Sequence, residues 1–145
     1  MSRAEHRPRI AFYAPMKAPT HPTPSGDRAM AQSLMALLSQ DAEVQLASDL
    51  RLYEPLGDRD QQALLQQRAA REVSRLCEGL GEIDLWVTYH NYYKAPDLIG
   101  PAVAAARDIP YVQIESTRAS KRLIGPWSEF AQAAHAAADQ AAAFF

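Results

Sequence analysis

The chain has 145 residues, and its 15 Lys and Arg against 17 Asp and Glu give a net charge of −2 at pH 7. The charges are nearly balanced, and no basic stripe indicates binding to nucleic acid. No apolar run approaches the roughly 18 residues that a membrane-spanning helix needs. The single Cys77 excludes an internal disulfide and fits a reducing compartment. The first ten residues lack the apolar centre of a secretion signal. We therefore expect a cytoplasmic protein, and a peripheral contact with the inner face of the membrane stays open.

Apolar runs and helical patterns alternate along the chain. In chain order we predict a strand over residues 9–15, a helix over 27–39, a strand over 43–48, a helix over 58–79, a strand over 83–90, a helix over 101–108, a strand over 111–116 and a helix over 127–139. The final AAAFF resembles the opening of a further strand. This alternation predicts an α/β domain, with a Rossmann-like doubly wound, mostly parallel sheet and helices on both faces.

Apolar spacing and helix-start signals give two local expectations. Met30, Leu34, Leu37 and Leu38 recur at helical spacing, so we expect them to form the buried face of the first helix. The Asp-Arg-Asp of residues 58–60 opens the second helix, where carboxylates complement the helix dipole. We therefore prefer a helix start to a metal site there, and no other cluster has metal-ligand spacing.

The loops that leave the predicted strands differ from the loops that enter them. Entering loops are short, whereas the leaving loops at residues 14–26, 90–100 and 117–126 are long or rich in polar side chains. In a parallel sheet all leaving loops lie at the carboxyl edge, where ligands of open α/β sheets bind. The pattern predicts a ligand-facing edge made of these three loops.

The first leaving loop ends in Gly26, Asp27 and Arg28. A glycine lets a ligand approach the backbone, and the helix start offers free N–H groups to an anion. Asp27 would repel such an anion and Arg28 would offset the repulsion. The alternative is a capped helix after a rigid proline loop. No G-x-G-x-x-G and no G-x-x-x-x-G-K-[ST] is present, which disfavours a dinucleotide or P-loop site.

The other two leaving loops carry the remaining candidates. His90 could exchange a proton near neutral pH, and Tyr92 and Tyr93 could stack on a ligand ring, with Lys94 beside them. A merely structural histidine is the alternative. In the last loop we expect Glu115 to be part-buried. Two further cations follow it in the chain, and they either bind an anion or form a solvated loop: Lys121 and Arg122.

Four motifs in this order resemble a known family: P-SGDR after the first strand, DLWVTYHNYYKAPDLIGP, IPYVQIES and SKRLIGPW. Together they resemble the N-terminal, acceptor-side domain of a bacterial GT-B glycosyltransferase close to glycosyltransferase family 4, over nearly the whole chain. The resemblance implies a hexosyltransferase that moves a sugar from a nucleotide-sugar to a glycan, lipid or small-molecule acceptor. The nucleotide-sugar would be its co-substrate, and the resemblance implies no cofactor.

The resemblance also assigns roles to residues. Gly26, with Asp27 and Arg28, would face the donor diphosphate. His90 and Glu115 would be catalytic, with Glu115 standing where the family usually has a histidine. The acceptor side would comprise Tyr92, Tyr93, Lys94, Lys121 and Arg122.

The resemblance implies that residues 1–145 form one half of an enzyme. The donor-binding C-terminal domain would then be a partner absent from this chain, and the chain alone would be inactive and prone to self-association. The alternative function is a stand-alone Rossmann-like ligand-binding or regulatory module without transfer chemistry.

Overall fold

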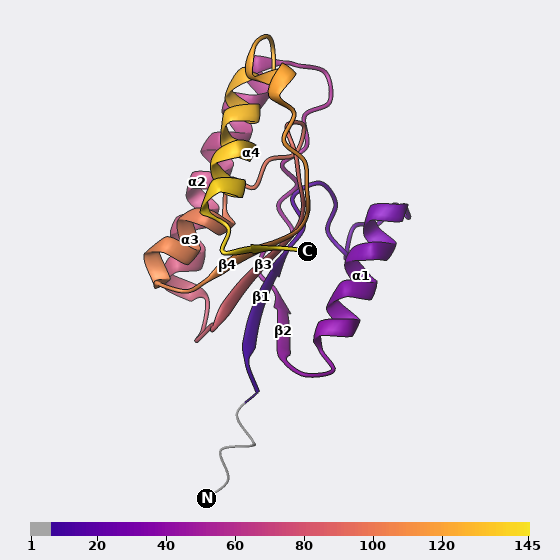
Figure 1. The fold of residues 1–145 in the computed structure, drawn as a ribbon, viewed down its shortest axis with the longest axis vertical. Helices are drawn as coiled ribbons and strands as arrows, with labels where there is room; N and C mark the ends of the chain where they lie inside the picture. The colour runs from indigo at the N-terminus through magenta and orange to yellow at the C-terminus, as the bar shows by residue number, and fades with distance from the viewer. Residues whose placement is uncertain (1–6) are drawn as a thin grey trace, which may run out of the picture.

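The computed structural model describes residues 7–145, so most of the charged segment that argues against a secretion signal lies outside the described residues. The described chain forms a parallel sheet with four α-helices (Figure 1). The strands are β1 (Arg9–Tyr13), β2 (Glu43–Leu46), β3 (Leu85–Asn91), β4 (Tyr111–Ser116) and β5 (Ala143–Phe144). The helices are α1 (Gly26–Leu38), α2 (Arg59–Gly79), α3 (Gly100–Arg107) and α4 (Ser128–Gln140). Within the described residues, no helix combines the length and apolar character needed to cross a membrane.

The strand order fixes where a ligand site is expected. The sheet runs β2-β1-β3-β4-β5, and every neighbouring pair is parallel. The chain winds from β1 to β2 on one side, then crosses to β3 and continues outward on the other. The order therefore reverses between β1 and β3. In open α/β sheets the crevice beyond the carboxyl ends of two such strands is the usual binding position.

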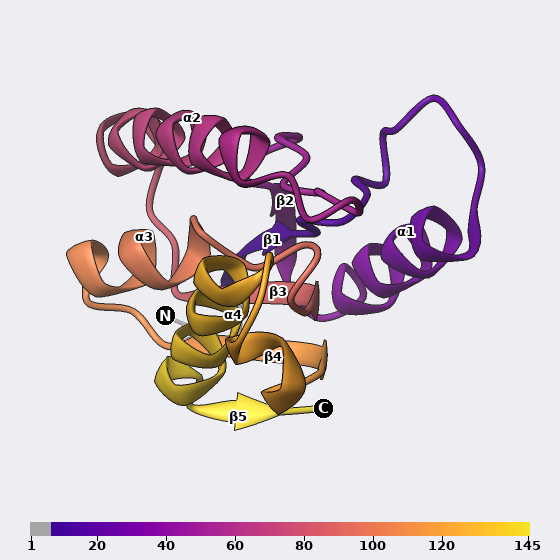
Figure 2. The same ribbon diagram turned by 90° about the horizontal axis from the view of Figure 1, so that it is seen from above.

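The helices cover the two faces of the sheet unequally. α1 lies alone on one face, and α2, α3 and α4 lie on the other (Figure 2). The core on the face of α2, α3 and α4 contains Trp86, Tyr111 and Phe130, and the core under α1 contains Phe12, Val87 and Tyr89. This confirms the Rossmann-like doubly wound α/β fold.

The buried face of α1 differs from the predicted one. Ala31 is buried and Leu34 and Leu38 pack beside it, whereas Met30 and Leu37 are 47% and 59% exposed. At 100° per residue, positions 31, 34 and 38 share one face, and positions 30 and 37 lie on its flank. A small alanine at the contact brings the helix close to the sheet, and the larger side chains then fall outside the interface. The spacing of the leucines alone does not show this.

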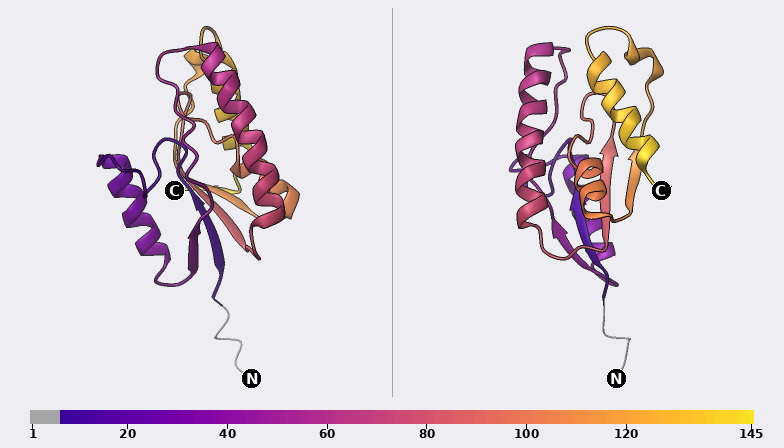
Figure 3. Two further views of the ribbon diagram at one scale, coloured as in Figure 1. Left: turned by 180° about the vertical axis from the view of Figure 1, so that it is seen from behind. Right: turned by 90° about the vertical axis from the view of Figure 1, so that its left-hand side faces the viewer.

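The segment after β4 contains an element that the sequence did not predict. A short 3₁₀-helix spans Ser120–Leu123, ahead of α4. Figure 3 shows that α2 and α4 begin at the same end of the molecule. Their preceding loops meet there, because the Arg59 guanidinium donates to the carbonyl of Gly125 (3.0 Å) and the Gln62 amide donates to that of Pro126 (3.1 Å).

Candidate functional site

The start of α1 meets the end of β3 at the point where the strand order reverses. The side chain of Ser25 caps α1 by accepting a hydrogen bond from the amide of Arg28 (3.2 Å). This places Asp27 in the first turn, where its Oδ1 lies 3.1 Å from Nδ1 of His90. The hydroxyl of Tyr89 donates to the same oxygen at 3.2 Å. Asp27, Tyr89 and His90 therefore form one hydrogen-bonded group, called the Asp27 triad below.

A left-handed residue in β3 makes this convergence possible. Neighbouring side chains of a regular strand point to opposite faces, yet Tyr89 and His90 reach one carboxylate oxygen. His90 has a φ of 68°, which turns its side chain out of the regular alternation. Such a backbone costs a residue with a side chain roughly 1–2 kcal/mol.

β4 carries the same irregularity at the same level. Tyr89 pairs with Ile114 and Asn91 with Ser116, so the position facing His90 is that of Glu115. Glu115 has a φ of 57°. Two adjacent strands therefore carry left-handed residues that are not glycine at the same level, one residue before their last paired position. Strain of this kind persists where the surrounding structure fixes it, and it gathers at functional sites.

Burial and neighbouring groups keep the phenols of Tyr89, a member of the Asp27 triad, and of the adjacent Tyr92 protonated. Burial, followed by the charges of Asp27 and Glu115, raises the pKa of Tyr89 well above its ordinary value. Burial, followed by the neighbouring Tyr53 and Asp27, raises the pKa of Tyr92 to about 12. Tyr92 stacks flat on the imidazole of His90, with ring centroids 4.5 Å apart. The site thus combines two carboxylates, an oriented imidazole and phenols that serve as hydrogen-bond donors.

A second group of predicted residues lies beside the first. Tyr92 meets Tyr93 edge to face at 5.8 Å, and Tyr93 meets Trp127 in the same way at 5.4 Å. Lys94 Nζ lies 5.8 Å from the centroids of both the Tyr93 and the Trp127 ring, and the Arg122 guanidinium carbon lies 5.0 and 5.2 Å from them. An aromatic row therefore links the Asp27 triad to a cationic group.

A buried carboxylate anchors the loop after β3. Asp97 accepts hydrogen bonds from the hydroxyls of Thr88 and Tyr111, both at 2.6 Å. It also accepts from the amides of Ile99 (3.0 Å) and Gly100 (2.8 Å), which caps the start of α3. Although these bonds oppose the effect, complete burial raises the pKa of Asp97. The wall of the site that follows β3 is therefore bonded into the core.

A second buried carboxylate joins the loops around the cationic group. Glu54 accepts from the amides of residues 56–58 (2.8–3.0 Å) and from the Gln62 side chain (3.1 Å). Burial opposes its ionisation, but these hydrogen bonds together lower the pKa of Glu54. Its backbone carbonyl accepts from the indole N–H of Trp127 (3.0 Å), and its amide donates to the carbonyl of Lys94 (2.8 Å). Glu54 thereby fixes the position of Trp127 relative to the loop after β3.

For three predicted site residues, the conformation, contact or exposure in the structure differs from the one that the sequence suggested. Gly26 has no neighbour within 4 Å of an added Cβ and no positive φ, so its expected conformational freedom is not used. Arg28 donates to the carbonyl of His21 (3.0 Å), so this contact holds the loop after β1 and does not offset Asp27. Glu115 is exposed, not part-buried, because its left-handed backbone turns it away from the sheet.

Sequence reasoning missed three residues that organise this edge. Tyr89 lies on the face that α1 covers, and its period-two position along β3 could have indicated this. Asp97 stands just before Gly100-Pro101, a helix-start signal that makes a capping carboxylate expected. Glu54 bonds amides of its own loop, but no local signal shows its contacts with Lys94 and Trp127, which belong to two other loops. Asp58 does cap α2 as predicted, accepting from the amides of residues 60 and 61.

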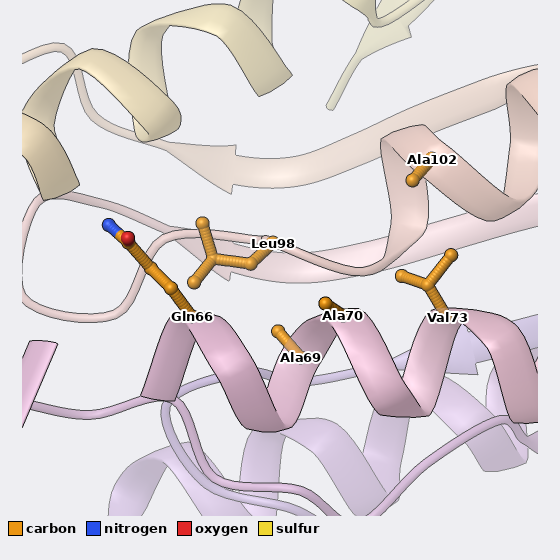
Figure 4. Close-up of a pocket in the computed structure, with 6 residues that line it drawn as sticks. All are labelled: Gln66, Ala69, Ala70, Val73, Leu98 and Ala102. Carbon is orange, nitrogen blue, oxygen red and sulfur yellow. The ribbon is translucent and has the colours of Figure 1, made fainter. Parts of the chain in front are cut away.

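A hollow of about 360 Å³ lies between α2 and α3, away from these groups. Figure 4 shows the side chain of Leu98 above α2, with Ala69, Ala70 and Val73 along the helix and Ala102 on the far side. No charged side chain lines it, and Gln66 is its one amide. It lacks the convergent polar groups that orient a polar ligand.

The fold and the Asp27 triad define a Rossmann-like domain with a polar site at its carboxyl edge. No family model matches the chain. Two curated proteins match it over 54 residues at 43% identity, and both are ribosomal protein uS12 methylthiotransferase RimO, from Stenotrophomonas maltophilia strains K279a and R551-3. The match covers 36% of this chain and 12% of each relative. The chain thus spans about an eighth of the length of these relatives.

These matches overturn the expected activity. They name a methylthiotransferase, so the predicted glycosyltransferase function and its hexosyltransferase class are wrong. The physical reason is that a Rossmann-like framework hosts many chemistries, so the order of strand-end motifs reports the fold and not the group transferred. The motif resemblance itself is tested by none of these findings and stays a prediction. The same holds for the predicted co-substrate, partners and compartment.

Proposed function

We propose that the chain is a Rossmann-like ligand-binding module that takes a small hydroxyl-bearing ligand between the ends of β1 and β3. One observation carries the proposal: His90 and Glu115 lie at one level of adjacent strands, both in the left-handed conformation, and His90 and Tyr89 both bond to Asp27. A fold that needed only stability would place glycine at such positions. The left-handed backbone of His90 and Glu115 directs their polar side chains toward the edge of the sheet where the strand order reverses.

The chemistry of the Asp27 triad suits a ligand that donates hydrogen bonds. Ionised Asp27 and Glu115 are acceptors only, and ligand hydroxyls are matching donors. Asp27 engages Nδ1 of His90, which leaves Nε2 as the ring nitrogen available to a ligand. Tyr92 supports the far face of the imidazole and holds it in place. The loop after β1 would cover a ligand bound here.

The proposal is tested by amide NMR of the full chain, titrated with a panel of polyols and nucleosides. We expect shifts at residues 26–28, 90 and 115, and a loss of affinity of about tenfold in Asp27→Asn, since one hydrogen bond to a charged group is removed. Asp41→Asn, an exposed position just after α1, is the matched control and should bind normally. Amide shifts confined to the hollow between α2 and α3, or equal ligand affinities for the two variants, would overturn the proposal.

A second candidate rests on the partial match. The matched relatives are named for action on ribosomal protein uS12, so a binding module for uS12 is the function that this match favours. The one cysteine, Cys77, lies near the end of α2 and packs against the core on the face of the sheet opposite α1, so it is not part of the Asp27 triad. Calorimetry with purified uS12 tests it. An absence of binding at micromolar concentrations would contradict it.

A further inference from the structure

We propose that the hollow formed by residues 118–122 and Tyr93 is a binding site for a phosphate group. The hollow has a volume of about 440 Å³ and is lined by Tyr93, Arg118, Ala119, Ser120, Lys121 and Arg122. Every charged side chain in this lining is a cation. The site is separate from the Asp27 triad, so the inference goes beyond the proposed function and can stand or fail without it.

In the part of the chain that the structure describes, two of the three cations in this lining lack a carboxylate partner, so the three do not form a purely structural ion-pair network. Within residues 7–145, Arg118 pairs with Asp139 at 2.7 Å, while Lys121 and Arg122 have no carboxylate within 4.0 Å. Lys94, which shares the Tyr93 and Trp127 rings with Arg122, has none either. Like charges within a Debye length of about 8–10 Å repel one another. A bound anion would relieve that repulsion.

Arg122 is held in place with its donors free. Its guanidinium lies over the rings of Tyr93 and Trp127, and its amide donates to the carbonyl of Ala119 (2.9 Å), which closes the 3₁₀ turn. Trp127 is itself fixed by the backbone of Glu54. No side-chain hydrogen bond of Arg122 is formed within the described chain. A planar guanidinium positioned in advance is the group best suited to grip a phosphate with two parallel N–H donors.

A phosphate matches this arrangement better than a single carboxylate. Its three oxygens can accept from a guanidinium, an ammonium and the Ser120 hydroxyl together. The phosphate could belong to a soluble phosphoester or to a lipid headgroup. The lipid source has support in Ile124, which is 86% exposed two residues beyond Arg122.

The direct test is calorimetry of the full chain at low salt with inorganic pyrophosphate and glycerol 3-phosphate. The double variant Lys121→Gln/Arg122→Gln should lose about tenfold or more in affinity, because charge-assisted bonds are the strong ones. The matched control Arg68→Gln/Arg71→Gln removes the same charge from exposed positions of α2 and should bind as the unmodified chain does. Circular dichroism confirms that both variants fold, since all four positions are exposed.

A spectroscopic readout reports on the site itself. Phosphate bound to Arg122, whose guanidinium lies over the Trp127 ring, should change the tryptophan emission, and Trp127→Phe should abolish that change while the buried Trp86 remains. Asp27→Asn should leave pyrophosphate affinity unchanged, so a failure of this site and a failure of the Asp27 triad are told apart.

Sedimentation with phosphatidylcholine vesicles, with and without phosphatidic acid, separates the two sources. Binding of soluble phosphates alone identifies a free phosphoester, and co-sedimentation that depends on phosphatidic acid and is lost in the Lys121/Arg122 variant identifies a headgroup. Both results support the proposal. Equal affinities for the two double variants, or no binding to any of these probes, would overturn it.

Discussion

The two loops that flank the switch point of the sheet are held in different ways. The loop after β3 is bonded to the buried Asp97, and it ends at Gly100, where an added Cβ would lie 2.4 Å from Asp97 and Trp86. The loop after β1 is largely exposed from residue 20 onward and ends at Gly26, where an added Cβ meets nothing within 4 Å. One wall of the site is therefore set by the core, and the other is tied to α1 by hydrogen bonds from the side chains of Arg28 and Gln32.

Removing the anchor of the β3 loop should have the largest effect. Asp97→Ala leaves two hydroxyls and two amides without their acceptor in the core, so we expect a loss of about 4 kcal/mol in the free energy of unfolding. Urea denaturation measures it, with Asp41→Ala at an exposed position just after α1 as the control. A loss below about 1 kcal/mol would show that the β3 loop is not fixed by this carboxylate.

The same change, glycine to alanine, tests this difference between the loops when it is made at Gly100 and at Gly26. Gly100→Ala must push aside Asp97, Trp86 or Tyr111, so we expect a loss of about 3 kcal/mol, at the upper end for overpacking. Gly26→Ala meets open space and should change stability by less than about 0.5 kcal/mol. Thermal unfolding of both variants measures the difference. Similar losses at the two positions would remove the contrast between the loops.

The hydrogen bonds to Glu54 predict that the stability of the folded chain depends on pH. Its pKa is lowered in the folded chain, so its stabilisation is present above the ordinary carboxyl pKa of about 4.3 and is lost as the pH falls through the folded value. Glu54→Gln should cost about 2 kcal/mol at pH 7, and the gap to the unmodified chain should narrow on acidification. Denaturation at several pH values measures this. Glu78→Gln, exposed on α2, should show no such gap.

The smallest predicted effect is a gain in stability. Glu115 is exposed but left-handed, so Glu115→Gly should stabilise the chain by about 1 kcal/mol through relief of backbone strain. Glu115→Ala removes the same carboxylate and keeps the strain, which makes it the matched control. If Glu115→Gly is no more stable than Glu115→Ala, the strain argument for the site fails.

The sequence predicted the parts of this protein that local patterns specify. Alternating apolar runs located the strands and helices to within about two residues, and β4 matches its predicted bounds. Parallel topology then placed the leaving loops at one edge, which is why Asp27 and His90 could be expected near each other. These features follow from periodicity and chain direction, and both can be seen in a single sequence.

The tertiary structure decided the features that make this edge a site. The contact of His90 with Asp27 spans 63 positions, and the contacts of Glu54 join three loops, so no local pattern encodes either. The left-handed backbone at His90 and Glu115 also escaped prediction, because glycine is the residue expected at such a φ. That both residues adopt it at the same level is visible only once the two strands are paired in the sheet. The sequence determined which loops face a ligand, and the packing determined which side chains in them converge.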